Sequence, residues 1–182
     1  MPTICILYGF CEGPRVSKRF RQALARAGYT VIKDPAQADI IIGHSGGCFS
    51  LPKQLRAKQI IQIGIVHWPG RSVLGSLIHK LKADVRHHHR EGAIRFWARK
   101  SFWNFVYFWN FVNLFRMLIG RRRGRQWGYG QITTVVRPKL DSFCTPDLDL
   151  LPFAKKPKFV ELPGQHDECW RKPDPYLALL KY

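Results

Sequence analysis

The residues with the clearest chemical content are Gly43-His44-Ser45-Gly46-Gly47, which match the pattern G-x-S-x-G. They directly follow the apolar run 38–42, which predicts a strand that runs into a sharp strand-to-helix turn. Glycines at the edges of such a turn let strand and helix crowd together, so the Ser45 hydroxyl is expected to be exposed above the sheet. Residues 48–58 are predicted to form the following helix, with Pro52 in its first turn. Ser45 is therefore a candidate nucleophile, and a helix N-cap serine is the alternative.

A serine nucleophile needs a general base, and the base needs a carboxylate that orients it. His166 lies in a loop after a strand predicted at 158–162, and Asp141 lies in a loop after a strand predicted at 132–136. In the fold that uses the G-x-S-x-G turn, the chain order is serine, acid, histidine, as it is here. The alternatives are a surface-loop histidine and a turn aspartate.

Four further residues near these positions are assigned lesser roles. The acids Asp147 and Asp149 are predicted to begin a short helix, and Asp167 is expected to point away from its neighbour His166. His44 fills the variable position of the turn and is predicted to line the pocket or to pack.

These patterns together resemble the α/β-hydrolase superfamily, over nearly the whole chain apart from a central insertion. The acid of that family commonly lies in an LD-x-x-x-x-P loop, like Leu140 to Pro146, and its histidine in a PG-x-H loop, like Pro163 to His166. The resemblance implies a Ser45, His166, Asp141 triad.

The same resemblance implies that two backbone N–H groups stabilise an oxyanion. One is the N–H of Gly46, the residue after the nucleophile. The second would come from the loop after the first strand, from Phe10 or Cys11, although a simple tight turn is the other interpretation of residues 9–13.

The other elements predict an α/β fold: an α/β-hydrolase-like, mostly parallel sheet of about six strands with helices on both faces and a helical cap insertion. Strands are predicted at 3–8, 29–33, 38–42, 59–66, 132–136 and 158–162, with a helix at 15–27 that ends at Gly28. Only residues 34–37 separate the second strand from the serine strand, too few for a crossover helix. We therefore expect a trimmed hydrolase core at 1–66 and 131–182, without the first antiparallel strands, and a cap at 67–130.

The cysteines favour a reducing compartment, and the spacing of the cysteines and histidines does not indicate a metal site. Five cysteines form an odd set without a CxxC pair, and Cys5 falls inside a predicted strand as a small buried apolar residue. Free thiols fit the cytoplasm, and the N-terminus lacks the basic flank of a signal peptide. The run His87-His88-His89 is interpreted as a solvated basic face. We expect neither a metal nor a cofactor.

The charge is concentrated in the predicted cap. Residues 67–130 hold 13 Lys and Arg against Asp84 and Glu91, so that +11 of the formal +18 lies there. The aromatic stretch 102–119 is apolar nearly all round and would be about 27 Å long as a helix, which is long enough to span a membrane. The strands predicted on either side belong to one sheet, so the chain must return to the same side of a bilayer, and a single span cannot do that.

Two interpretations of Phe96–Arg125 remain open: a helix on an anionic membrane surface, which we prefer, or a cap buried on the core or in a dimer. Nucleic acid is a weaker candidate, since Phe and Val dominate the stretch.

The sequence thus predicts a serine hydrolase of the esterase or lipase type, acting on a small-molecule or lipid ester. It would be cytoplasmic and peripheral on the inner face of the membrane. The alternative is a non-enzymatic, membrane-associated or interaction protein on a hydrolase scaffold. No oligomeric state is predicted.

Overall fold

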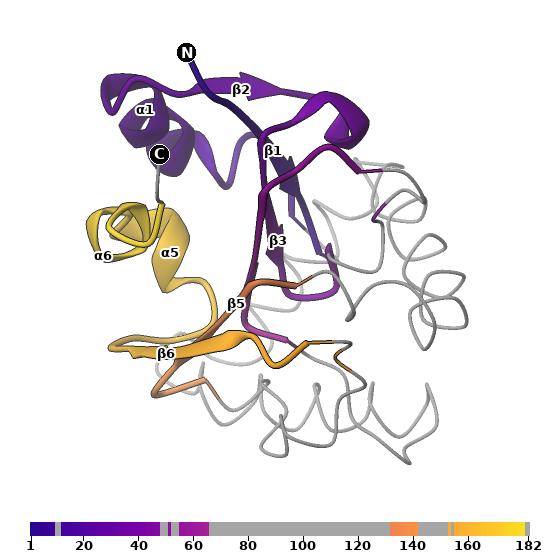
Figure 1. Ribbon diagram of the computed structural model, residues 1–182. Helices are drawn as coiled ribbons and strands as arrows, with labels where there is room; N and C mark the ends of the chain where they lie inside the picture. Colours follow the sequence, from indigo (N-terminus) through magenta and orange to yellow (C-terminus); the bar gives the residue numbers. More distant parts are fainter. Residues whose placement is uncertain are drawn as a thin grey trace.

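The computed structural model describes residues 1–9, 12–47, 51, 55–65, 132–141, 153 and 155–180. Six strands form one sheet in the order β2-β1-β3-β4-β5-β6 (Figure 1), and every pairing in it is parallel. The strands are β1 (Thr3–Leu7), β2 (Thr30–Ile32), β3 (Ile40–His44), β4 (Gln59–Ile63), β5 (Thr134–Pro138) and β6 (Lys158–Leu162). The predicted fold class is therefore confirmed, and the carboxyl ends of all six strands lie at one edge.

The described helices cover one face of this sheet. They are α1 (Lys18–Arg26), α5 (Glu168–Arg171) and α6 (Asp174–Leu177). Helix α1 buries Phe20, Ala23 and Leu24 at helical spacing, and it contacts both α5 and α6. It ends as predicted, because Gly28 has φ +86°, a left-handed conformation that glycine adopts without steric cost.

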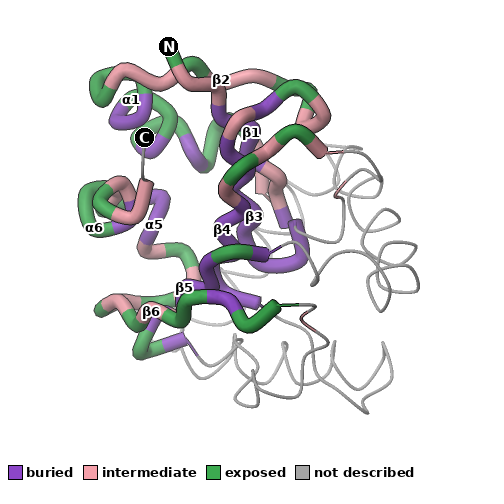
Figure 2. Tube along the Cα trace, viewed as in Figure 1, coloured by how far each residue is buried: buried purple, intermediate pink, exposed green. Residues whose placement is uncertain are grey.

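The four central strands β1, β3, β4 and β5 are mostly buried, as expected for a parallel sheet covered on both sides, whereas the edge strands β2 and β6 are not. Alternate residues of β1, β3 and β4 pack under the helices, among them Ile4, Ile42 and Ile61. Their neighbours in sequence, such as Cys5 and Ile41, form a second core on the other face with Leu51, Leu55, Ala57 and Phe153. Figure 2 shows that the buried residues are concentrated in the central strands, whereas β2 and β6 are intermediate or exposed over most of their length. Cys5 is a free, buried thiol as predicted, and burial followed by the charge of Asp34 raises its pKa to about 11.

The structure corrects two local predictions. Leu51 and residues 55–57 are not helical, so the helix predicted at 48–58 is wrong as a continuous element. Proline disfavours the helical conformation of the residue before it, which is Leu51 here. Strand β5 begins at Thr134, two residues later than predicted, after Thr133 has bonded Ile60 through its hydroxyl.

The short connection between β2 and β3 is η1 (Pro35–Gln37), a single 3₁₀ turn capped by Asp34. The prediction that no crossover helix fits between these strands is thus confirmed. The predicted cap, residues 67–130, lies outside the described residues. None of the helices that the structure describes is long and apolar enough to cross a membrane.

Candidate active site

Ser45 lies in the turn directly after β3, at the carboxyl edge of the sheet. Its φ is +57°, and among the described residues it is the only non-glycine residue with a positive φ. For a residue with a side chain this conformation costs about 1–2 kcal/mol. The backbone is held there by β4: the Ser45 N–H donates to the Ile63 carbonyl at 2.9 Å, and the Ser45 carbonyl accepts from Gln62 Nε2 at 2.5 Å.

Two glycines make room for this turn. A Cβ on Gly47 would overlap the Leu7 carbonyl oxygen, so the crowding predicted at Gly47 is observed. A Cβ on Gly9 would lie 2.6 Å from Ser45 Cβ and 3.1 Å from its hydroxyl oxygen. This close approach of Gly9 contributes to the burial of Ser45, which is only 4 % exposed. The prediction of a hydroxyl standing exposed above the sheet is wrong for this structure.

Asp141 and His166 are brought together by the loops that follow β5 and β6. Imidazole Nδ1–H of His166 donates to Asp141 Oδ2 at 2.6 Å, and the carboxylate is fully buried. The two loops are fastened to each other, since the Leu140 N–H donates to the Gly164 carbonyl at 2.9 Å. With Nδ1 protonated and held by a carboxylate, Nε2 of His166 is left as the basic nitrogen.

Gly64, just after β4, lies against this pair. Its φ is +64°, and a Cβ there would be 2.9 Å from His166 Cε1 and 3.2 Å from Asp141 Oδ2. The sequence analysis did not single out Gly64. The one signal available was its position directly after a buried strand.

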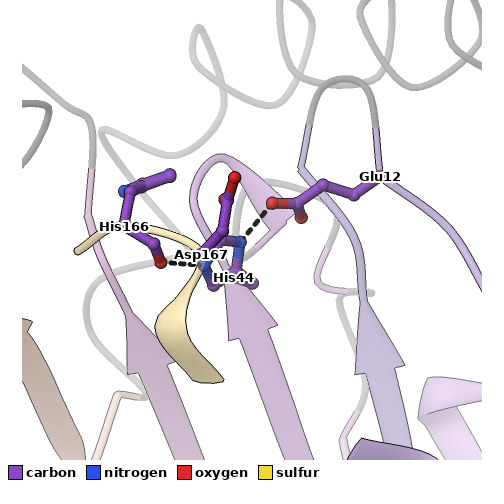
Figure 3. A group of neighbouring side chains, drawn as sticks. All are labelled: Glu12, His44, His166 and Asp167. Atoms are coloured by element: carbon purple, nitrogen blue, oxygen red, sulfur yellow. Dashed lines mark hydrogen bonds and ion pairs between the residues drawn. The ribbon is translucent and has the colours of Figure 1, made fainter. Parts of the chain in front are cut away.

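A second polar cluster adjoins Ser45 and is drawn in Figure 3. His44 is fully buried, its Nδ1 forms an ion pair with Glu12, and its Nε2 donates to the His166 carbonyl at 2.8 Å. Burial, the largest single influence, would lower the pKa of His44, but the charge of Glu12 and that of Cys169, with the hydrogen bonds to both, together outweigh burial and hold that pKa well above its usual range. Burial, again the largest single influence, would raise the pKa of Glu12, yet the charge of His44, its hydrogen bond and the charge of His166 together lower it.

Metal-ligating atom types do occur in this cluster. Glu12, His44, His166 and Asp167 each offer one such atom, and these atoms all lie within 4.8 Å of one another. The prediction that Asp167 points away from His166 is therefore wrong.

The predicted site residues fall into two groups. Ser45, Gly46, Asp141 and His166 all lie at the carboxyl edge of the sheet, and Gly46 is buried in the turn. Phe10 and Cys11, the alternatives for the second oxyanion donor, lie outside the described residues, as do Asp147 and Asp149. Glu12 and Gln62 were missed. Gln62 is a polar residue within a buried strand, which was the signal available in the sequence.

The sequence matches no protein-family model, and no curated protein matches it. Solved structures match over nearly the whole chain. An epoxide hydrolase from Vigna radiata superposes with a TM-score of 0.58 at 11 % identity, over 96 % of this chain and 88 % of that one. A bacterial membrane phospholipase A gives 0.56 at 16 % identity, over 97 % and 77 %. A monoacylglycerol lipase from Paleococcus ferrophilus gives 0.51 at 11 % identity, over 96 % and 93 %.

These likenesses agree with the six-stranded, all-parallel sheet and its helices. The chain therefore has the α/β-hydrolase fold.

Proposed function

We propose that the protein is a serine hydrolase of the esterase or lipase type, in which Ser45, His166 and Asp141 act as the triad. The observation that carries the proposal is the 2.6 Å hydrogen bond between His166 and Asp141, at the same sheet edge as a serine with φ +57°. A buried carboxylate that fixes the tautomer of a histidine is what a general base for a hydroxyl nucleophile requires.

The chemistry follows from these roles. Ser45 Oγ would attack the carbonyl carbon of an ester while His166 Nε2 takes its proton, and His166 would then return that proton to the departing alkoxide. The N–H of Gly46, with that of Phe10 or Cys11, would stabilise the oxyanion. Water would release the acyl group from Ser45 by the same steps in reverse.

The solved structures of the same fold favour a hydrolytic reaction, because those that match include an epoxide hydrolase, a lipase and a phospholipase. The G-x-S-x-G turn of this chain carries a serine, a residue that acts as the nucleophile of acyl transfer in such a turn. We therefore assign this chain an ester or acyl substrate.

The basic segment 67–130 supports ester hydrolysis at a membrane surface. We assign residues 67–130 as a cap on the core at 1–66 and 131–182, with Phe96–Arg125 placed on an anionic membrane surface on the cytoplasmic side. Aromatic residues next to a run of arginines suit the headgroup boundary of such a surface. The substrate would then be a lipid ester or a small ester delivered there.

A non-enzymatic role on a hydrolase scaffold is the second candidate, favoured by a core that reaches the serine strand through a single 3₁₀ turn. Turnover separates the two candidates. A panel of p-nitrophenyl esters of increasing acyl length should be hydrolysed by the wild type, with a loss of several orders of magnitude in Ser45→Ala and in His166→Ala. Absence of wild-type hydrolysis, or equal rates in Ser45→Ala, would favour the scaffold.

A further inference from the structure

The inference concerns His44, which lies between the nucleophile turn and the loop of the base. His44 is the last residue of β3, directly before Ser45, and it is fully buried. Its ring packs between the rings of His166 and Trp170, with centroid distances of 4.7 Å to each. Nε2 of His44 donates to the backbone carbonyl of His166 at 2.8 Å (Figure 3). One ring thus connects the two segments that carry the proposed nucleophile and base.

Glu12 extends this connection to a third segment, the loop after β1. One of its carboxylate oxygens forms the ion pair with His44, and the other accepts the N–H of Gly9 at 2.8 Å. Gly9 is the residue that packs against the Ser45 side chain. The three loops around Ser45 are therefore joined through two side chains.

Both ring nitrogens of His44 face oxygen acceptors, Glu12 at Nδ1 and the His166 carbonyl at Nε2. Only the imidazolium carries a proton on each nitrogen, so it is the form that satisfies both contacts. The other titratable groups near the ring are the Cys169 thiol, whose pKa burial raises, the His166 imidazole and the Asp167 carboxylate. The carboxylate of Glu12 supplies the opposite charge that a buried imidazolium needs.

We propose that Glu12 and His44 form a positioning pair, in which charged His44 holds the backbone of His166 in register with the turn of Ser45. The effect expected on turnover rests on the proposed hydrolase function. The effect expected on the loop of His166 rests on the contacts alone. The contacts that carry this role are to backbone and between the two residues, so both are positioning residues. A displacement of about 1 Å in a reacting group costs about 10²-fold in rate.

A divalent metal held by Glu12, His44, His166 and Asp167 is the competing account of the same cluster. A histidine that binds a metal through Nδ1 commonly donates its other ring N–H to a carbonyl, as Nε2 of His44 does. The two accounts differ at Nδ1, which carries a proton in one and a metal in the other. That difference can be measured directly.

The experiment uses Glu12→Gln as the parent, so that no variant leaves a buried carboxylate without its partner. In this parent the introduced amide can donate to Nδ1 of neutral His44, and His44 still donates through Nε2. We therefore expect kcat to fall by less than about 10-fold. Adding His44→Gln supplies an amide donor near the Nε2 position and should stay close to the parent. Adding His44→Leu fills the volume without a donor and should lower kcat by a further ~10²-fold with little change in KM. Glu168→Gln, which removes the carboxylate of the ion pair with Lys172, is the control with unchanged turnover.

Two NMR readouts do not depend on turnover. Imidazole ¹H–¹⁵N spectra of the wild type should show both nitrogens of His44 protonated at neutral pH, without change on addition of stoichiometric ZnCl₂. Hydrogen exchange of the Glu168 amide, which donates to the Gln165 carbonyl in the loop of His166, should be faster in the His44→Leu double variant than in the His44→Gln one.

The outcomes separate the two proposals. If the wild type hydrolyses no ester, the hydrolase proposal fails, and the NMR readouts still decide the role of His44. A neutral His44 ring, displacement of its Nδ1 proton by Zn²⁺, or equal kcat and equal exchange in the two double variants would overturn the positioning pair.

Discussion

The two ends of the parallel sheet use polar side chains in different ways. At the amino end, side chains bond to backbone: Asp39 Oδ2 accepts the N–H of Thr3 at 2.8 Å, and Thr133 Oγ1 both accepts from and donates to Ile60 at 3.0 Å. At the carboxyl end, some side chains also bond to backbone, but two pairs of titratable side chains contact each other, His166–Asp141 and Glu12–His44. The first arrangement completes the hydrogen bonding of strand termini, whereas the second orients titratable side chains toward one another.

The amino end of the sheet also carries a cavity. A cavity of about 470 Å³ opens at the amino end, where Lys58, Thr134 and Lys158 are among its lining residues. Its two lysines are exposed. The buried, paired groups at the other end are the better guide to chemistry, because functional sites commonly combine burial with a specific charged neighbour.

The largest expected effect is on kcat, and it distinguishes an aspartate at the carboxyl end, Asp141, from one at the amino end, Asp39. Asp141→Asn should lower kcat by about 10⁴-fold, because an amide allows His166 the wrong tautomer. Asp39→Asn should leave kcat unchanged and lower the free energy of unfolding by about 1 kcal/mol through weaker bonds to Thr3. Steady-state ester hydrolysis and urea unfolding measure both. Asp147→Asn and Asp149→Asn serve as controls, and full activity in Asp141→Asn would refute the assignment of the acid.

A pair of glycines gives the next largest effect. Gly64→Ala and Gly28→Ala both place a side chain at a positive φ, and each should cost about 1–2 kcal/mol of stability. Only the Cβ at residue 64 meets His166 and Asp141, whereas residue 28 has open space. Gly64→Ala should therefore also lower kcat by about 10²-fold. Equal kcat in the two variants would mean that the histidine and the aspartate tolerate the added methyl group.

The basic insertion should bind anionic vesicles in a salt-dependent manner. Each arginine near such a surface contributes about 1 kcal/mol, so replacing Arg121, Arg122 and Arg123 with glutamine should weaken binding by about 10²-fold at low salt. Hydrolysis of a small soluble ester should be unaffected. Trp103→Ala and Trp109→Ala should weaken binding at any salt. Vesicle co-sedimentation measures this, and equal partitioning of the wild type to neutral vesicles would remove the electrostatic part of the proposal.

The smallest effect is a pH-dependent difference in stability between wild type and Glu12→Gln. The lowered pKa of Glu12 adds stability above its usual value of 4.5, which is lost as the pH falls through the lowered pKa. The raised pKa of His44 adds stability below its usual value of 6.5, which is lost as the pH rises through the raised pKa. The free energy of unfolding of the wild type should therefore exceed that of the variant most between these two usual pKa values, by about 1–3 kcal/mol. A difference that does not vary with pH would contradict the ion pair.

Local patterns in the sequence predicted much of the fold and of the proposed triad. Runs rich in isoleucine, such as 40–42 and 59–63, predict buried strands, and the turn at Ser45 follows one of them directly. Asp141 and His166 could be assigned because strand ends in a parallel sheet share one edge. The 48–58 helix failed because one proline outweighed an otherwise acceptable apolar spacing.

The positioning residues could not be predicted in this way. Glu12 and His44 are separated by 32 positions, and Gly64 meets His166 across more than 100, so only the assembled sheet brings them together. His44 occupies a position of the turn that tolerates any residue type, which concealed its contacts with Glu12 and His166. Burial of Ser45 likewise depends on Gly9, a contact between loops of two different strands.

The most direct test of the central claim is the site of covalent labelling by a fluorophosphonate. Peptide mass spectrometry of the labelled wild type should place one adduct on Ser45, with no adduct in Ser45→Ala and a labelling rate lowered by orders of magnitude in His166→Ala. Thr133→Val, at the opposite end of the sheet, should label at the wild-type rate. An adduct on another residue, or undiminished labelling of Ser45→Ala, would contradict the assignment of Ser45 as the nucleophile.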